Sequence, residues 1–237
     1  MCLSQFRMSL PALYPASKLQ RKRLYRRLIL HHLPLLLISA GAVLLLYVTR
    51  PYTDVWSKAS FATAYPALFL VLATLAIGPF NVLFRRRNPV SIDLRRDIGI
   101  WAGILSIAHT VIGQNVHLRG RPWLYYVYAP REHHRFPVRH DAFGFANYTG
   151  LICTLLVIAL LATSNDYALR RMGARQWKSL QRWNYAAFAL ATAHAFAYQE
   201  GVEHQKLLWV WLISIGIAFT LALQIAGWLR RKNPGIS

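Results

Sequence analysis

The chain has 237 residues, of which 55% are hydrophobic, and it carries a formal net charge of +20 at pH 7. Its mean hydropathy is +0.28. Apolar runs of roughly 20 residues alternate with arginine-rich connectors, which is the pattern of a membrane protein and excludes a separate nucleic-acid-binding domain. The two cysteines, Cys2 and Cys153, exclude a disulfide framework.

Six apolar segments predict six transmembrane helices, because each approaches or exceeds the length that crosses about 30 Å of hydrocarbon. In chain order they are 28–48, 61–84, 98–116, 143–163, 183–199 and 207–229. The expected fold is all-α: a polytopic six-transmembrane-helix bundle at 28–229, between a basic tail at 1–27 and a short tail at 230–237. We expect no cleavable signal peptide, since the first apolar run is long enough to stay in the membrane.

Lysines and arginines are divided unequally between the two sides of this predicted bundle. Seven lie in the N-terminal tail, five in the connector 85–96, five in the connector 170–182 and three after residue 229, which gives 20 on one side against 8 on the other. The positive side of a membrane protein faces the cytoplasm. The sequence therefore predicts a plasma (inner) membrane protein with both termini cytoplasmic and the 26-residue connector 117–142 outside.

Two histidines, His109 and His194, are the only ones deep inside the apolar segments. Each lies twelve residues beyond a polar residue at the cytoplasmic end of its segment, Asp97 and Arg182 respectively. The third and fifth segments run in the same direction, so each imidazole is expected about 18 Å from the cytoplasmic face. Equal depth on neighbouring helices predicts that the two side chains meet.

Small residues accompany both histidines at helical spacing. The positions that share a face with them are Ala102, Leu105, Ser106 and Gly113, and Ala187, Leu190, Ala191, Ala197 and Tyr198. Such residues leave room for a flat macrocycle, although they also simply let membrane helices pack closely.

Level, inward-facing imidazoles are the ligands that an intramembrane haem needs on its two axial positions. A closed zinc site would need four ligands, and only Cys153 comes near this depth. The Cys-x-x-Cys-His signature of covalent attachment is absent from the sequence, so the expected cofactor is haem b. The alternative is a cofactor-free membrane protein, either a proton or solute pathway with the histidines as a polar relay, or an assembly factor.

Three stretches then resemble a known family, the ferric-reductase-like transmembrane domains. They are RRDIGIW at 95–101 followed by His109, NYTG at 147–150 with ATSN at 162–165, and WKSLQRWNY at 177–185 followed by His194. The closest subfamily is the haem-binding subunit of the periplasmic methionine sulfoxide reductase system, the MsrQ or YedZ type. The resemblance covers residues 95–199 and implies an electron-transfer subunit of an oxidoreductase that binds haem through His109 and His194.

The chain departs from that family at two places. Gln181 stands where the family usually has a histidine, and the connector between the third and fourth segments is long, with His133, His134 and His140 among arginines and aromatic residues. Relatives with two stacked haems carry a second histidine thirteen or fourteen positions along each ligand helix, and this chain has none there, so we expect one haem. His117 and His204 could in principle form a second ligand pair, but their offsets along the chain from His109 and His194 differ, and both lie at helix ends.

The partners expected from this interpretation lie on both sides of the bilayer. The printed sequence contains no flavin or nicotinamide domain, so electrons are expected from quinol or a separate flavoprotein on the cytoplasmic side. The acceptor is expected to be a protein or small oxidant outside, with the connector 117–142 as its docking surface. Arg95 and Arg96 are expected to be topology anchors within reach of an anionic headgroup, a flavin phosphate or a haem propionate.

Overall fold

The computed structural model describes residues 18–84, 90–118, 121–201 and 207–232. Its regular structure in these ranges is helical, apart from an isolated bridge between Val127 and Val138. The elements in chain order are α1 (Lys18–Arg27), the π-helical turn η1 (Leu28–His32), α2 (Leu33–Thr49), α3 (Val55–Leu83), α4 (Val90–Gly113), the 3-10 turns η2 (Pro122–Tyr125) and η3 (Pro130–Glu132), α5 (Ala142–Ala162), α6 (Asp166–Gln181), α7 (Asn184–Gly201) and α8 (Leu207–Lys232).

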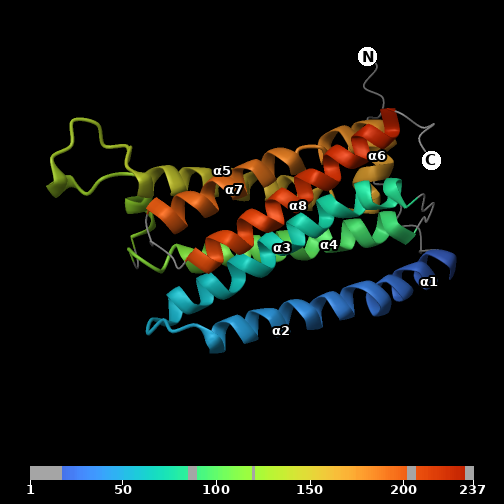
Figure 1. The fold of residues 1–237 in the computed structure, drawn as a ribbon, viewed down its shortest axis with the longest axis horizontal. Helices are drawn as coiled ribbons and strands as arrows, with labels where there is room; N and C mark the ends of the chain where they lie inside the picture. The colour runs from blue at the N-terminus through green and yellow to red at the C-terminus, as the bar shows by residue number, and fades with distance from the viewer. Residues whose placement is uncertain (1–17, 85–89, 119–120, 202–206, 233–237) are drawn as a thin grey trace, which may run out of the picture.

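The long helices lie side by side as a bundle (Figure 1). Helix α3 packs against α2, α4 and α8, and α5 packs against α4 and α7. The start of α1, the start of α4, the end of α8 and α6 gather at one end of the bundle, and the connector between α4 and α5 projects from the other (Figure 1). This arrangement agrees with the division of sides expected from the basic residues.

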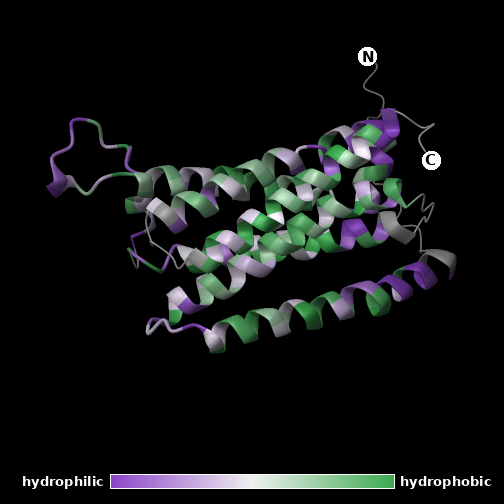
Figure 2. Ribbon diagram, in the orientation of Figure 1, coloured by the Kyte–Doolittle hydropathy of each residue, from purple (hydrophilic) through white to green (hydrophobic). Residues whose placement is uncertain are grey.

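The bundle carries its large apolar side chains on the outside. Phe69 is 70% exposed, Ile38 65% and Ile215 60%, whereas Ala62 and Ala146 are fully buried. A soluble bundle would bury the large residues, so this distribution fits a hydrocarbon surround with small residues at the helix contacts. Along the long axis of the bundle, Figure 2 shows apolar residues in the middle and polar residues gathered at the two ends.

Four helical segments in the described part of the chain are long and apolar enough to cross a membrane. They are Arg21–Thr49, Val55–Leu83, Ala142–Ala162 and Leu208–Lys232. The predicted third and fifth spans correspond to α4 and α7, which are more polar: α4 carries four charged residues in its first two turns, and α7 has polar ends. Six spans remain the prediction, since α4 packs against the apolar helices α3 and α5, and α7 packs against α5.

Polar side chains define where the helices begin. Asp54 accepts a hydrogen bond from the backbone N–H of Ser57 at 2.8 Å, and Asp141 and Asn165 cap α5 and α6 in the same way. At the end of α4 that leads into residues 117–142, which we call the outer connector after its predicted side, the fully buried Tyr125 accepts from the N–H of His117 and donates to the carbonyl of Gly113. The start of the outer connector is therefore fastened to the helix that carries His109.

Helix α1 is joined to α4 by two parallel ion pairs. Arg23 contacts Asp93 at 2.8 Å, and one turn further along both helices Arg27 binds Asp97. Asp97, which sequence analysis treated as an anchor at the membrane surface, is fully buried and also accepts a hydrogen bond from His31 at 2.7 Å. The π-helical turn places His31 and His32 next to this carboxylate, since one turn of wider helix changes the face on which they lie.

Candidate functional site

A large cavity runs through the interior of the bundle and has a volume of about 1010 Å³. Its walls come from α3, α4, α5, α7 and α8, with the end of α6 at one mouth. Ligand pockets usually hold about 300–1,000 Å³, so this space is large enough for a group of macrocycle size. No Asp or Glu is among the described residues that line it.

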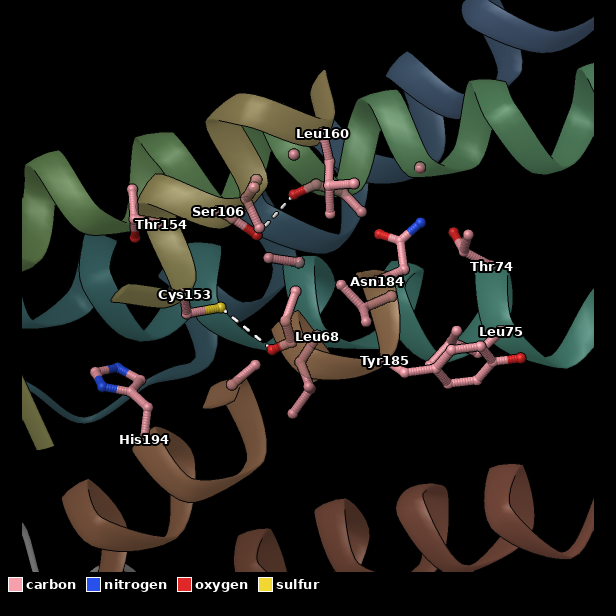
Figure 3. A pocket seen from close by; sticks show the side chains of 18 of the residues that line it. Leu68, Thr74, Leu75, Ser106, Cys153, Thr154, Leu160, Asn184, Tyr185 and His194 are labelled. Carbon is pink, nitrogen blue, oxygen red and sulfur yellow. Dashed lines mark hydrogen bonds between the residues drawn. The ribbon is translucent and has the colours of Figure 1, made fainter. Parts of the chain in front are cut away.

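His109 and His194 both line this cavity and lie next to each other. Their ring centroids are 6.0 Å apart, and the two ring planes are inclined at 71°. The equal spacing of these residues from Asp97 and Arg182 in the sequence thus corresponds to two imidazoles at one depth of the bundle. Figure 3 shows His194 projecting from α7 into the cavity beside Cys153.

Each imidazole is held by a backbone carbonyl of a neighbouring helix. The Nδ1–H of His109 donates to the carbonyl oxygen of Ser60 on α3 at 3.0 Å, and the Nδ1–H of His194 donates to that of Ala146 on α5 at 2.7 Å. A carbonyl oxygen only accepts, so Nδ1 carries the proton and the lone pair of a neutral ring is on Nε2. This is the tautomer and the second contact that metal-binding histidines usually have.

The spacing of the rings fits two axial ligands of one metal ion. An imidazole nitrogen binds a first-row metal at about 2 Å, and the ring centre lies about 1 Å behind that nitrogen, so two opposed ligands hold their ring centres roughly 6 Å apart. The observed separation is 6.0 Å. The donor set, two neutral imidazoles in an apolar space, suits a porphyrin that supplies four further nitrogens.

A glycine on α5 allows His194 to reach its position. A Cβ atom at Gly150 would lie 2.7 Å from Nδ1 of His194 and 2.9 Å from its Cε1, closer than side chains tolerate. The sequence analysis quoted Gly150 only as part of a motif, because its contact is with a helix more than 40 residues away. The carbonyls of Ser60 and Ala146 were not predicted either, since a backbone acceptor leaves no mark in a sequence.

Most of the residues expected to share a helix face with the histidines do line the cavity. Ala102, Ser106, Gly113, Ala187, Ala191 and Tyr198 are among its walls. Leu105 instead packs in a buried cluster with Leu35 and Ala67, on the side of α4 that faces α2 and α3. Tyr198 lies against His194 at a ring distance of 5.1 Å and donates to the side chain of Asn147.

The remaining histidines lie in other surroundings. His117 contacts the rings of Phe143 and Tyr198, and its proposed companion His204 lies outside the described residues. On the outer connector, His134 stacks on Tyr128 at 3.6 Å and lies 5.8 Å from His140. Gln181, which stands at the family's histidine position, lines the inner part of the cavity and donates to Ser164 at 3.4 Å.

Fold and site together define a helical membrane protein with a buried histidine pair that is suited to a metal-centred macrocycle. The curated relatives include haem-binding subunits of protein-methionine-sulfoxide reductase, MsrQ, from Yersinia pseudotuberculosis and Yersinia pestis. Each is 30% identical over 144 residues, which is 56% of this chain, and the matched chain spans 58% and 57% of those two proteins. The resemblance to the MsrQ type is thereby confirmed, over little more than half of the relatives' length.

Two other comparisons gave no match. No protein-family model matches the chain, and no solved structure matches it significantly.

Proposed function

We propose that this protein is a haem b electron-transfer subunit of an oxidoreductase, with His109 and His194 as the two axial ligands of one haem. The observation that carries the proposal is the pair of imidazoles 6.0 Å apart, each with Nδ1 bound to a carbonyl and Nε2 left for a metal. The name of the Yersinia relatives, which describes haem binding, supports the same choice.

When bound, the haem supplies a reversible one-electron carrier inside the bilayer. The chain's own residues do the rest. Ser60 and Ala146 fix the imidazole tautomers, and small residues on α4 and α7 give a flat group room. His109 and His194 would hold the metal from both sides and leave it no open position for substrate, so the proposed role is electron transfer rather than chemistry at the metal.

The electron path proposed for this subunit crosses the membrane outward. The donor is quinol or a separate flavoprotein on the cytoplasmic side, and the acceptor is a protein or small oxidant outside. The outer connector suits contact with a protein partner, since Trp123 is 56% exposed and Phe136 67% among several arginines. A membrane protein of the MsrQ type, which is named as the subunit of a reductase, is expected to work with such a partner.

The proposed topology has six spans, with both termini in the cytoplasm of a plasma (inner) membrane protein. A fluorescent reporter fused after residue 232 should therefore fold and fluoresce, and alkaline phosphatase fused there should be inactive. Phosphatase inserted between Pro130 and Arg135 should be active. The opposite pattern at both positions would reverse the proposed direction of electron flow and leave the haem site untouched.

The cofactor proposal is tested by the absorption spectrum of the purified protein. We expect a Soret band and, after dithionite, the α-band of a low-spin b-type haem, with about one haem per chain by pyridine haemochrome. Protein without a Soret band after expression with added haem precursor would overturn the proposal, and a ratio near two would overturn the single-haem stoichiometry.

A further inference from the structure

The cavity continues well beyond the histidine pair toward the end of the bundle where α4 begins. Figure 3 shows this continuation, with His194 and Cys153 at one side and Thr74, Asn184 and Tyr185 at the other. Gly99, which lies against Thr74, is ten residues from His109 on α4, a distance of about 15 Å along the helix. That is farther than the edge of a porphyrin lies from its iron, so this inner half of the cavity has room for a second ligand.

The side chain of Arg95 enters the inner half from α4. The Nε–H of Arg95 donates to the carbonyl oxygen of Thr74 at 3.0 Å, and its Nη1 lies 3.3 Å from the place a Cβ would occupy at Gly78. The missing side chain at Gly78 thus leaves the space in which the guanidinium lies. The arginine is half-buried between α3 and α4 and forms part of the cavity wall.

Arg95 differs from three other arginines of the bundle, each of which pairs with a carboxylate. Arg27 is bound to Asp97, Arg96 to Asp166 at 2.6 Å and Arg139 to Asp141 at 2.8 Å. Among the described residues no carboxylate lies within ion-pair distance of Arg95, and no Asp or Glu lines the cavity. A guanidinium held in an apolar wall is costly unless an anion compensates it.

The mouth beside Arg95 is also cationic. Lys178, Arg182 and Arg231 line it, so three helices (α4, α6 and α8) and the turn between α6 and α7 each bring a positive charge to one end of the cavity. Such a set suits the multiple oxygens of a phosphate, which guanidinium and ammonium groups bind through charge-assisted hydrogen bonds.

The same region is bordered by α7 and α8. Helix α8 packs on α3 and α7 packs on α5, so few backbone contacts join α7 and α8 directly. Phe188 of α7 and Ile217 of α8 meet in one apolar cluster on α3. Tyr185 bridges α7 and α8 through one hydrogen bond to Gln224 at 3.2 Å. The walls further inside, such as Leu75, Leu160 and Ile213, are apolar and suit a hydrocarbon chain.

We propose that the inner half of the cavity binds a phosphate-bearing amphiphile, with its phosphate on Arg95 and its apolar part among Leu75, Leu160 and Ile213. An anionic phospholipid is the source that fits the apolar walls. A water-soluble phosphate compound is the second source of the same headgroup chemistry. The site needs no haem, so it stands independently of the proposed electron-transfer function.

The test uses native mass spectrometry of the full-length protein, delipidated and titrated with phosphatidylglycerol or phosphatidylcholine in detergent. Wild type should retain one phosphatidylglycerol in preference to phosphatidylcholine, and Arg95→Gln should weaken this about tenfold, the loss expected for one charge-assisted hydrogen bond. Arg95→Lys should keep part of the preference. Arg171→Gln is the matched control. Arg171 is exposed on α6, so this substitution removes one positive charge from the same end of the bundle without altering the cavity wall.

Each further outcome has a defined meaning. A water-soluble phosphate compound retained by the wild type and lost in Arg95→Gln supports the proposal and identifies the source by its mass. Equal retention in Arg95→Gln and Arg171→Gln, or equal binding of the two lipids, overturns it. The haem spectrum is recorded on the same samples: if Arg95→Gln loses haem and keeps the lipid, Arg95 serves the haem's carboxylates and the proposal fails, while the electron-transfer function stands.

Discussion

The two halves of the bundle interior are built from different interactions. In the outer half, His109 and His194 each donate a hydrogen bond from the imidazole ring to a backbone carbonyl. The cavity around them is lined mainly by small or apolar side chains. In the inner half, charges prevail: Asp97 is buried among Arg27, His31 and His32, and Arg95 faces the cavity. The contrast separates a site that is shaped for a flat, largely apolar ring system from a region that holds helices and anions by charge.

This contrast predicts that changes in one half leave the other half unaffected. Variants in the outer half should alter the haem spectrum with little effect on helix docking. Variants in the inner half should alter stability with little effect on the spectrum.

The largest effect is expected from Gly150→Ala. The new methyl would lie 2.7 Å from Nδ1 of His194, so the ring must move and lose its bond to the carbonyl of Ala146. We expect loss of most low-spin haem per chain, measured by the Soret absorbance of equal amounts of purified protein. Gly41→Ala is the control, because no atom lies within 4 Å of the added methyl. Normal haem content in Gly150→Ala would mean that His194 is not held as described.

Asp97→Asn should destabilise the inner half. It leaves the Arg27 guanidinium, whose side chain is 13% exposed, without its carboxylate. Breaking a buried pair in this way costs about 3 kcal/mol or more, whereas an exposed pair costs about 1 kcal/mol or less. Asp93→Asn is the matched variant one turn earlier, since its partner Arg23 is 58% exposed. Thermal unfolding in detergent should show a clearly lower Tm for Asp97→Asn alone, with the Soret band of both variants unchanged below the transition.

The same ion pair should make stability depend on pH at acid values. Burial acts to raise the pKa of Asp97, but hydrogen bonds from Arg27 and His31 outweigh it, so the pKa lies below its ordinary value of 3.8. A carboxyl with a lowered pKa stabilises the fold at pH above its unfolded value and loses this contribution as pH falls toward the folded one. The Tm of the wild type should therefore fall more steeply below about pH 4 than that of Asp97→Asn. Parallel curves would refute the pairing.

The smallest effect is expected from Ser60→Ala. His109 is held by the backbone carbonyl of Ser60 at 3.0 Å, while the hydroxyl is at 3.5 Å, so the main interaction survives the change. Haem content should match the wild type, with at most a small change in midpoint potential in a redox titration. A loss of haem as large as that of Gly150→Ala would show that the hydroxyl, rather than the carbonyl, positions His109.

Sequence periodicity and spacing were sufficient for the helices and for the histidine pair. Equal offsets from Asp97 and Arg182 put two residues 85 positions apart at one depth, because a helix rises uniformly. Helix α6, in contrast, lies in a segment that the sequence analysis treated only as a basic connector. Helix α6 is amphipathic and polar on average, so a search for long apolar segments does not detect it.

The burial of Asp97 could not be predicted from its neighbours in the sequence. Its partners Arg27 and His31 lie 70 and 66 residues away on α1 and η1. The direction of His31 is set by a π-helical turn, which has no reliable sequence signal. For the same reason, the sequence does not indicate the hydrogen-bond acceptors of the histidines. These acceptors are backbone carbonyls of other helices: α3 packs against α4 beside His109, and α5 packs against α7 beside His194. Tertiary contacts thus supply the details that turn two level histidines into a candidate site.

The measurement that tests the central claim most directly is the optical spectrum, before and after dithionite, of wild type, His109→Ala, His194→Ala and His134→Ala. The account predicts a low-spin b-type spectrum in the wild type and in His134→Ala, whose ring lies on the outer connector against Tyr128. It predicts loss of the low-spin spectrum in each of the other two, because one remaining imidazole leaves a five-coordinate iron. A low-spin spectrum that persists in His109→Ala or His194→Ala would contradict the assignment of this pair as the axial ligands.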